Sequence, residues 1–399
     1  MNIQTFFANL RNFEKTRNTN HFKDYSLDLF MNALIEFGLW ENPVRKNKFN
    51  NRPIRISIIG TNGKGTISYF LSQLALLSKL FQKVGLYTSP HLLSQNERIQ
   101  VNGYVIKDEW LNDKLIELIQ KKPSLLNTLS FFENFTLFAI LYFKEFKCDL
   151  EIYEAGLGGR LDATKLTNPE IVVLGSIGLE HTEILGDTEE KILLEKLEIS
   201  NARTHSLFHF LKTKKLRSII KEYCFERKIK CYEFQEPFQG NYLEFNRLYS
   251  IFIFNKLCKK YKLNPISIVD PKILATLPGR MEIISSSPFI IYDVAHNIQA
   301  IESLMNSIQI KYPSYKWNII FACMKDKDAL SMVNYLLTNK NVIQLILIQS
   351  PEFQEIELSH EKIVRCVFDN LNNMIQESNN YLVCGSFKLY NRFVGKFMK

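Results

Sequence analysis

A glycine-rich turn near the start of the chain carries residues suited to binding a polyphosphate. The apolar run 54–59 leads into Gly60-Thr61-Asn62-Gly63-Lys64-Gly65-Thr66, and a helical pattern of apolar residues follows. Glycines let backbone N–H groups approach phosphates closely, and a helix N-terminus adds positive potential. We expect Lys64 to reach the terminal phosphates and the Thr66 hydroxyl to ligate Mg²⁺. The order of strand, turn and helix therefore predicts a nucleotide site.

The turn is a variant of the P-loop pattern. Its first glycine lies nearer the lysine than usual, and Gly65 separates Lys64 from Thr66. The plain alternative is a glycine turn with a surface lysine. The flanking strand and helix favour phosphate binding, because the mechanism requires both of them.

Further blocks follow in a fixed order along the chain. They are Thr88-Ser89-Pro90-His91-Leu92, Glu154-Ala-Gly-Leu-Gly-Gly-Arg-Leu-Asp-Ala-Thr164, Ser176-Ile-Gly-Leu-Glu-His-Thr182, Glu195-Lys196, Pro278-Gly279-Arg280 and Asp293-Val-Ala-His296-Asn297. In this order they resemble folylpolyglutamate synthase/dihydrofolate synthase, a branch of the Mur ligase superfamily. The resemblance begins near Thr5, reaches the C-terminus, and is densest from Ile54 to Lys196.

The resemblance implies metal-binding roles in the first part of the chain. It assigns Ser89, Glu154 and His181 to metal ions, with His181 at a second Mg²⁺ that a carbamylated Lys196 helps to hold. Oxygen ligands suit Mg²⁺, and a carboxylate that ends an apolar strand is costly unless paired or metal-bound. The alternatives are a turn hydroxyl for Ser89, a satisfied loop histidine for His181 and, for Lys196, a solvated lysine in a helix dense with charge. After Lys196, Leu197-Glu198 replaces the family's Ala-Gly.

The resemblance implies nucleotide contacts in the later part of the chain. Asn246, Arg280 and Asp293 are expected to contact ATP from the far wall of a cleft between two domains. His296 is expected to lie near the phosphates or the incoming amino acid, with a catalytic role alongside Lys64 and Lys196. Here Val294 replaces a glycine of the family pattern, and the usual His-Gln pair near Asn246 is absent. The alternative for Arg280 is a surface turn arginine.

Composition bounds the class of protein and its partners. The 399 residues are 46% hydrophobic and 23% charged, which fits a globular protein of two domains. The formal charge of +9 comes from dispersed basic residues. We expect no nucleic-acid partner from it, and a modest positive field suits anionic substrates such as ATP and polyglutamate.

The cysteines and the N-terminus bear on the compartment. Seven cysteines form no C-x-x-C pair, and the first residues show no signal-peptide pattern. Together these features favour reduced thiols and a cytoplasmic protein. The most apolar stretch, 129–146, contains three charged residues, so it predicts a buried helix and no membrane association.

Strand and helix patterns alternate through the first part of the chain. Expected strands are Ile54–Ile59, Val84–Tyr87, Leu150–Glu154 and Ile171–Ser176, with an expected helix at Phe131–Phe146. This alternation predicts a mainly parallel sheet with helices on both faces, and ligands bind such sheets beyond the carboxyl ends of the strands. Four groups of candidate residues each follow a strand: Gly60–Thr66, Ser89, Glu154 and His181.

The pattern restarts after the Pro-Gly-Arg turn. Expected strands there are Phe289–Tyr292, Trp317–Ala322, Val342–Ile348 and Tyr381–Cys384. We therefore predict an α/β protein with a P-loop-containing, mainly parallel sheet domain over 1–277 and a smaller Rossmann-like domain over 278–399. The segment 201–239 gives no clear pattern and is shorter than in the family.

The reaction that the resemblance implies is ATP-dependent ligation of L-glutamate to a folate or pteroate. Mg²⁺ and Lys64 neutralise charge as the acceptor carboxylate attacks the γ-phosphate, and the amine of glutamate then attacks the acyl phosphate. We expect a monomer. Two alternatives stay open: another Mur-type ligase, acting on a cell-wall or cyanophycin-like precursor, and a nucleotide-binding homologue without catalysis. The sequence also leaves open whether dihydropteroate, folates or both are accepted.

Overall fold

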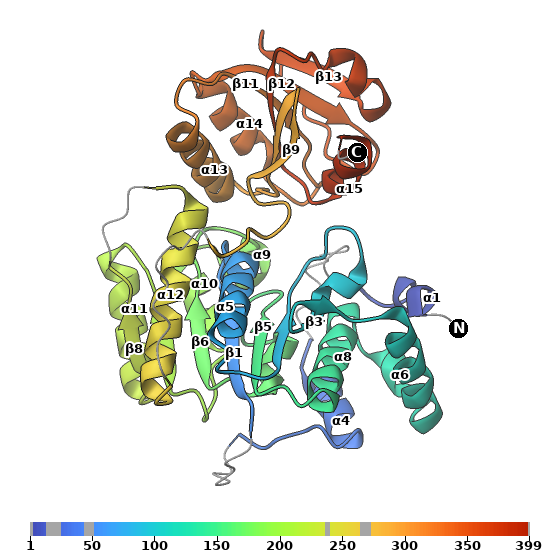
Figure 1. Cartoon of the computed structure of the whole chain (residues 1–399), viewed down its shortest axis with the longest axis vertical. Helices are drawn as coiled ribbons and strands as arrows, with labels where there is room; N and C mark the ends of the chain where they lie inside the picture. Colours follow the sequence, from blue (N-terminus) through green and yellow to red (C-terminus); the bar gives the residue numbers. More distant parts are fainter. Residues whose placement is uncertain (1–2, 13–24, 44–51, 236–239, 264–272, 398–399) are drawn as a thin grey trace. The chain divides into compact units, whose positions relative to one another are not determined.

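The structure, a computed structural model, describes residues 3–12, 25–43, 52–235, 240–263 and 273–397 (Figure 1). The chain divides into two compact units. The first contains Met1–Glu236 and Asn246–Ala275, and the second contains Pro237–Phe245 and Thr276–Lys399. None of the helices in the described ranges is both long and apolar enough to cross a membrane.

The first unit is built on a sheet that, over the described residues, has eight strands in the order β4-β3-β2-β5-β1-β6-β7-β8. The strands are β1 (Ile54–Ile59), β2 (Val84–Tyr87), β3 (Ile99–Val101), β4 (Tyr104–Val105), β5 (Leu150–Glu154), β6 (Ile171–Leu174), β7 (Ser206–His209) and β8 (Lys230–Glu233). Pairing is parallel from β2 to β8, while β3 and β4 add an antiparallel edge. Every residue of β2, β5 and β6 is buried, so both faces of the sheet centre are covered.

Helices surround this sheet (Figure 1). They are α1 (Ile3–Ala8), α4 (Asp28–Glu36), α5 (Lys64–Ser78), α6 (Asp108–Lys121), α7 (Leu125–Thr128), α8 (Phe131–Glu145), α9 (Thr182–Leu185), α10 (Glu189–Leu197), α11 (Lys214–Glu226) and α12 (Tyr242–Lys260), with 3₁₀ turns η1 (Gln95–Arg98) and η2 (Ala163–Thr167). Helix α5 packs on β1, β2 and β5, directly behind the glycine-rich turn. Helix α8 starts with a capping box in which Ser130 and Glu133 satisfy each other's backbone N–H groups.

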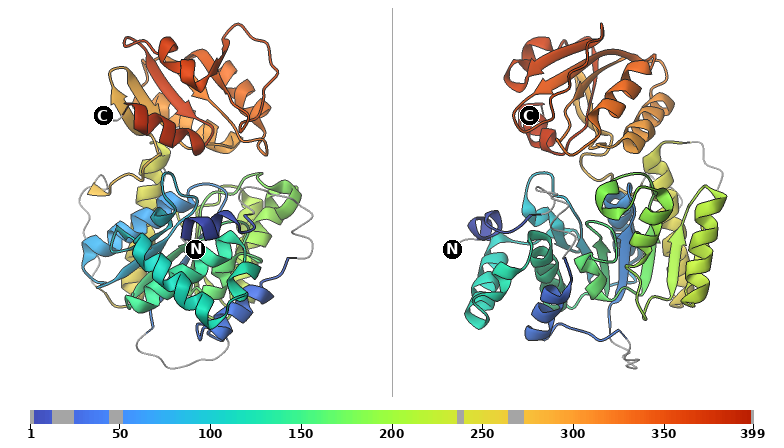
Figure 2. Two further views of the ribbon diagram at one scale, coloured as in Figure 1. Left: turned by 90° about the vertical axis from the view of Figure 1, so that its right-hand side faces the viewer. Right: turned by 180° about the vertical axis from the view of Figure 1, so that it is seen from behind.

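The second unit has its own sheet, with six strands over the described residues in the order β13-β12-β11-β14-β10-β9. The strands are β9 (Glu282–Ser286), β10 (Phe289–Tyr292), β11 (Trp317–Phe321), β12 (Val342–Gln349), β13 (Ile363–Val367) and β14 (Asn380–Cys384); the helices are α13 (Ile298–Lys311), α14 (Ala329–Thr338) and α15 (Lys388–Phe397), with a 3₁₀ segment η4 (Phe368–Met374). Only the β9–β10 hairpin is antiparallel among these pairs. Figure 2 shows both units from two further sides.

The expected α/β class and each expected strand are confirmed, with small differences at the ends. Strand β6 stops at Leu174 instead of Ser176, because Gly175 and Ser176 bond to the last residue of β1 and to the turn that follows it. The N–H of Gly175 donates to Ile59 O at 2.7 Å, and that of Ser176 donates to Asn62 O at 3.2 Å. The unreadable segment 201–239 contains β7, α11 and β8 in its described part, so it continues the strand–helix alternation.

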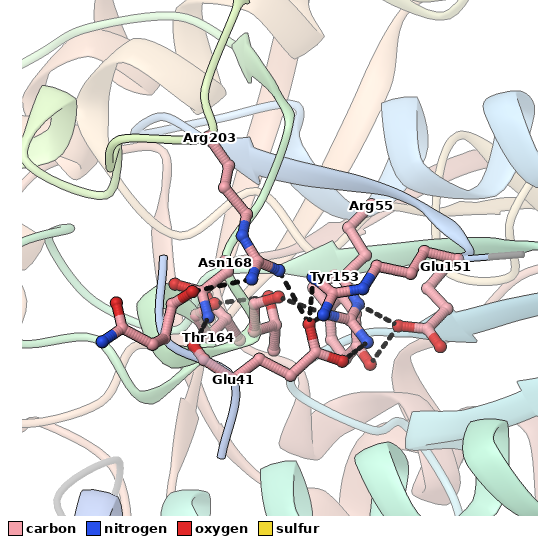
Figure 3. A network of polar contacts seen from close by, with 10 residues as sticks. Glu41, Arg55, Glu151, Tyr153, Thr164, Asn168 and Arg203 are labelled. Atoms are coloured by element: carbon pink, nitrogen blue, oxygen red, sulfur yellow. Dashed lines mark hydrogen bonds and ion pairs between the residues drawn. The ribbon is translucent and has the colours of Figure 1, made fainter. Parts of the chain in front are cut away.

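A network of ion pairs fastens the amino ends of the central strands (Figure 3). Arg55 of β1 donates to Glu151 of β5 at 2.8 Å and to Glu41 at 3.0 Å. Arg203, just before β7, donates to the same Glu41 carboxylate at 2.7 Å. Burial alone would raise the pKa of Glu41, but Arg55 and Arg203 lower it to about 2. The network lies at the start of the strands, whereas the candidate residues follow their ends.

Candidate active site

The turn between β1 and α5 has a backbone that two of its glycines make possible. Gly60 has φ +145°, and a Cβ added there would lie 3.0 Å from the Cα of Gly175. Gly63 has φ +88° and immediately precedes the first residue of α5. Other residues rarely adopt these angles, so the sequence gives the turn a shape in which backbone N–H groups point out at the start of a helix.

A second loop, which follows β6, holds this turn in place. The N–H of Thr61 donates to Ser176 O at 2.7 Å, and the N–H of Asn62 donates to the Ser176 hydroxyl at 3.2 Å. The Thr61 hydroxyl donates to Gly178 O and accepts from Gly178 N, each at 3.1 Å. The Thr61 side chain therefore joins two loops inside the protein, a role that the sequence did not suggest.

Two lysines meet at one carbonyl oxygen of the turn. Lys64 Nζ donates to Gly60 O at 3.0 Å and to Thr61 O at 3.2 Å. Lys196 Nζ, from the end of α10, donates to the same Gly60 O at 3.0 Å. Lys196 is only 4% exposed, so the alternative of a solvated lysine is wrong. Burial and the neighbouring Lys64 lower the pKa of Lys196 to about 7, which leaves much of its amine uncharged near neutral pH.

The Gly158-Gly159 pair explains how Lys196 reaches the turn. A Cβ added to Gly159 would lie 2.2 Å from the carbonyl oxygen of Lys196, so only glycine allows α10 to come this close. The N–H of Arg160 donates to Glu195 O at 3.2 Å. Asp162, also in this block, accepts from the N–H groups of Gly156 and Leu157 at 2.8 and 2.9 Å. Gly159 therefore accommodates the backbone of α10, while a Cβ added to Gly158 would meet the side chains of Leu185 and Glu195.

The predicted metal ligands Ser89 and Glu154 lie next to each other. Glu154 ends β5, is 3% exposed, and accepts from the backbone N–H of Ser89 at 3.0 Å. The Thr66 side chain, in the first turn of α5, is 1% exposed. Helix α5 packs on β5, which places both elements at one part of the sheet.

Two residues that the sequence analysis left without a role shape the loop around Ser89. The Glu97 carboxylate accepts from the N–H groups of Leu92, Leu93 and Ser94 at 2.7 to 2.9 Å. Buried Arg98 donates to His91 Nδ1 at 2.9 Å and lies over the ring of Phe131 at 5.0 Å. A carboxylate three residues after a serine is a capping-box signal, so the role of Glu97 could have been read from the sequence.

His181 lies in the loop that holds the glycine-rich turn. It has φ +53° and precedes α9, three residues after Gly178. Its Nε2 lies 3.8 Å from Glu180 Oε1. Among the described residues, no cluster of three or more His, Cys, Asp or Glu side chains could hold a metal ion. The predicted ligands Thr66, Ser89 and Glu154 are two hydroxyl groups and one carboxylate. A set with a single carboxylate does not count as a cluster of three His, Cys, Asp or Glu side chains.

Asn246 lies beside the turn, on the first unit. A Cβ added to Gly63 would lie 3.6 Å from Asn246 Oδ1, and the Asn246 side chain is buried. The sequence analysis grouped it with Arg280 and Asp293, but the structure assigns those two residues to the second unit. The contacts with ATP that are expected of these three residues stay a prediction, and Asn246 would make its contact from the first unit.

In the second unit, Asp293 organises the Pro-Gly-Arg turn. Its carboxylate accepts from Met281 N and Ala295 N, each at 2.9 Å, and from the hydroxyl of Tyr242. Burial raises the pKa of Asp293, although Arg280 and these donors oppose the rise. The hydrogen bond between Tyr242 and Asp293 joins residues far apart in the sequence, so no local sequence pattern predicts it.

Arg280 and His296 converge on one aromatic ring. The Arg280 guanidinium lies 5.7 Å from the ring centre of Phe387, and the His296 ring lies 5.1 Å from it. His296 Nδ1 donates to Val294 O at 2.8 Å, which fixes the proton on that nitrogen because a carbonyl oxygen only accepts. Both side chains are half-buried, so Arg280 is not simply a surface turn arginine.

Comparisons with known proteins agree with this architecture. The model of the Mur ligase, glutamate ligase domain family matches residues 279–385. A dihydrofolate synthase/folylpolyglutamate synthase of Buchnera aphidicola subsp. Acyrthosiphon pisum is 31% identical over 350 residues, which cover 79% of this chain and 82% of that protein.

Two solved structures show the same fold. FolC of Escherichia coli in complex with DHPP and ADP superposes with a TM-score of 0.81 at 24% identity, covering 99% of this chain and 97% of that one. The bifunctional folylpolyglutamate synthase/dihydrofolate synthase of Yersinia pestis, complexed with AMPPNP and a Mn ion, gives a TM-score of 0.75 at 23% identity, covering 94% of both chains. On the length and identity of the Buchnera match, this chain belongs to the dihydrofolate synthase/folylpolyglutamate synthase family of ATP-dependent ligases.

Proposed function

We propose that this chain joins L-glutamate to the carboxylate of a pteroate or folate, and that the Gly60–Thr66 turn binds the ATP that drives the reaction. ATP-dependent ligation of glutamate to folates is the activity of its family. One observation supports the assignment to these residues. Lys64 and Lys196 both donate to the Gly60 carbonyl oxygen, in a turn that leads into a helix. Two amines at one phosphate-binding turn suit a polyanionic ligand.

A divalent cation fits the side chains around Glu154. The Glu154 carboxylate accepts from the N–H of Ser89, and the hydroxyl groups of Ser89 and of Thr66, on the helix that packs on β5, are further oxygen ligands of the kind that Mg²⁺ prefers. We assign Thr66, Ser89 and Glu154 to a first Mg²⁺ and His181 to a second. A bound cation would neutralise phosphate charge. The presence of a Mn ion in the Yersinia pestis relative supports a divalent cation.

The protein groups provide positioning and charge for the first step. Lys64 exchanges its bonds to Gly60 O and Thr61 O for phosphate oxygens, and the N–H groups of the turn bind the same phosphates. An acceptor carboxylate oxygen attacks the γ-phosphorus, the bond to the ADP oxygen breaks, and an acyl phosphate forms. Fixed positive charge at this point lowers the barrier, since charge spreads over the transferred group.

The second step forms the amide. The amine of L-glutamate attacks the acyl carbon, the carbon–oxygen bond to phosphate breaks, and inorganic phosphate leaves. In the second unit, we assign Arg280 and Asp293 to the nucleotide and His296 to the phosphates or the incoming amino acid. The Phe387 ring beside Arg280 and His296 supports a shared location for these two side chains.

Lys196 is the residue that we propose to be carbamylated. An uncharged amine attacks CO₂, a nitrogen–carbon bond forms as one C–O π bond opens onto oxygen, and the nitrogen releases one proton. Burial and Lys64 lower the pKa of Lys196 to about 7, which makes the amine available near neutral pH. Protein equilibrated with ¹³CO₂ should give a carbamate carbon signal by NMR that Lys196→Ala lacks and the exposed-site variant Lys83→Ala keeps. A spectrum without that signal would contradict the modification.

The test of the proposed function is a panel of acceptors. Purified protein is supplied with ATP, Mg²⁺, L-glutamate and either dihydropteroate or tetrahydrofolate, and ADP and the amide product are both measured. We expect ADP release that requires glutamate together with at least one acceptor, and the accepted compound assigns the acceptor class. Nucleotide binding without ADP release on any acceptor would instead identify a homologue that has lost catalysis.

A further inference from the structure

Two cysteines of the first unit, Cys224 and Cys231, pack in the same apolar cluster. Cys224 lies in the last turn of α11 and Cys231 lies in β8, which forms an edge of the first sheet. The helix packs against the strand. Between them Lys228 has φ +56°, and the N–H of Ile229 donates to Cys224 O at 2.8 Å. This tight turn leads the chain back along α11, and Cys231 packs against the buried apolar cluster that contains Cys224.

The two thiols affect each other's ionisation. Cys231 raises the pKa of the Cys224 thiol, and Cys224 lowers the pKa of the Cys231 thiol. The side chain of His209, on the adjacent strand β7, lowers the pKa of Cys231 further. Cys231 is therefore the thiol that ionises more easily, and thiolates are the form that reacts with oxidants.

Exposure also distinguishes Cys231. Six of the seven cysteines are buried and Cys231 is half-buried, so it is the one that a small oxidant reaches most readily. Cys323 and Cys384 offer an internal contrast. Cys384 ends β14 and Cys323 lies two residues after the paired strand β11, but both are completely buried in the second unit. A reagent from solvent has no comparable access to that pair.

We propose that Cys224 and Cys231 form a redox-active dithiol, which a peroxide converts into an intramolecular disulfide that joins α11 to β8. The Cys231 thiolate attacks one peroxide oxygen, the O–O bond breaks, and a sulfenic acid forms as hydroxide leaves. The Cys224 thiol then loses its proton and attacks that sulfur, and the S–O bond breaks. Two thiols are oxidised, and one hydrogen peroxide is reduced to two waters.

The full chain provides a direct test, because trypsin cleaves after Arg227, Lys228 and Lys230, between the two cysteines. Native protein is treated with hydrogen peroxide, alkylated with N-ethylmaleimide, digested and analysed by mass spectrometry. We expect peptide 222–227 to be linked to the peptide that begins at Cys231, and dithiothreitol to remove the link. The pair Cys323 and Cys384 should stay reduced under the same treatment.

Two variants and a stability measurement complete the test. Cys231→Ser should abolish the linked peptide, whereas the matched control Cys258→Ser should keep it. The oxidised wild-type chain should unfold at a higher temperature than the reduced chain, because the link restricts the unfolded state. Overoxidation of Cys231 to sulfinic acid without a link, a link to another cysteine, or two fully alkylated thiols after peroxide treatment would each overturn the proposal.

Discussion

At the scale of single residues, Lys64 and Lys196 are the most informative pair. Both donate to Gly60 O, although two ammonium groups repel each other. Burial, together with this repulsion, lowers the pKa of Lys196 and so favours its neutral form. The division of roles follows: the half-buried Lys64 is suited to carry charge to a phosphate, and the buried Lys196 is suited to covalent modification.

Replacing Lys64 should remove chemistry while leaving the fold intact. Lys64→Ala loses the charge at the turn but no buried apolar contact, so we expect kcat to fall by about 10²- to 10³-fold, with little change in thermal stability. Steady-state kinetics and thermal unfolding measure the two effects. Lys83→Ala, on an exposed lysine, is the matched control. A near-normal rate with saturating ATP would show that the turn only connects two elements.

Two glutamates of β5 should separate metal binding from stability. Glu154→Gln keeps the shape but loses the charge that a divalent ion needs, so higher Mg²⁺ concentrations should be required for half-maximal rate. Glu151→Gln removes the carboxylate that pairs with Arg55 at the other end of the strand, so it should lower stability without changing that requirement. Titrations of the rate with Mg²⁺ test both variants. Equal Mg²⁺ dependence in Glu154→Gln and wild type would refute the assignment.

The sequence predicted individual residues where a motif carries local chemistry. The glycines of the turn, Lys64 and Glu154 follow from strand, turn and helix patterns. The partner of Asp293 did not, because Tyr242 is 51 positions away in the chain. The burial of Lys196 did not follow either, since the charged sequence around α10 is typical of an exposed helix.

At the scale of elements, glycines allow two backbones to approach each other closely. The end of α10 packs directly against Gly159, where an added Cβ would lie 2.2 Å from Lys196 O. Gly159→Ala should therefore displace α10 and lower the free energy of unfolding by on the order of 2 kcal/mol or more.

The comparison variant Gly395→Ala should instead raise the free energy of unfolding by about 0.5–1 kcal/mol, because Gly395 lies in α15 with open space around it. Urea unfolding compares the two, and an unaffected Gly159→Ala would contradict the close approach.

The ion-pair network of Figure 3 predicts how the strand ends respond to acid. The pKa of Glu41 is about 2 in the folded chain against 4.5 ordinarily, so its contribution is present above pH 4.5 and is lost as the pH falls toward 2. With allowance for solvent screening, this contribution is about 1–2 kcal/mol.

The free energy of unfolding should therefore fall less in Glu41→Gln than in wild type when the pH is lowered from about 5 to about 3, a range in which the Glu41 contribution is being lost. Glu36→Gln, which removes a half-exposed pair with Lys122, is the control and should follow wild type. Chemical denaturation at several pH values makes the measurement. Parallel curves for wild type and Glu41→Gln would show that the network contributes nothing to acid sensitivity.

Elements were predicted best where apolar runs lie at the centre of a sheet. The strands β1, β2, β5 and β10 have the bounds that their apolar sequences indicate. β8 was missed because it is an edge strand with charged residues at both ends and no fully buried position. Such a strand depends on its neighbour β7, which local sequence does not reveal.

At the scale of the whole molecule, two sheets of different topology carry the predicted residues. Lys64, Glu154 and Lys196 lie in the first unit, and Arg280 and His296 lie in the second. The fold and the family agree with the order of motifs along the chain. An excess of basic over acidic residues also suits the anionic substrates of a glutamate ligase.

The central claim is that the acceptor carboxylate is activated by direct attack on the γ-phosphate of ATP. An acceptor labelled with ¹⁸O in its carboxylate tests this most directly, because each turnover then transfers one carboxylate oxygen to phosphate. Mass spectrometry of the phosphate released with ATP, Mg²⁺ and L-glutamate makes the measurement. We predict one ¹⁸O atom per phosphate formed. Unlabelled phosphate released together with the amide product would contradict the account.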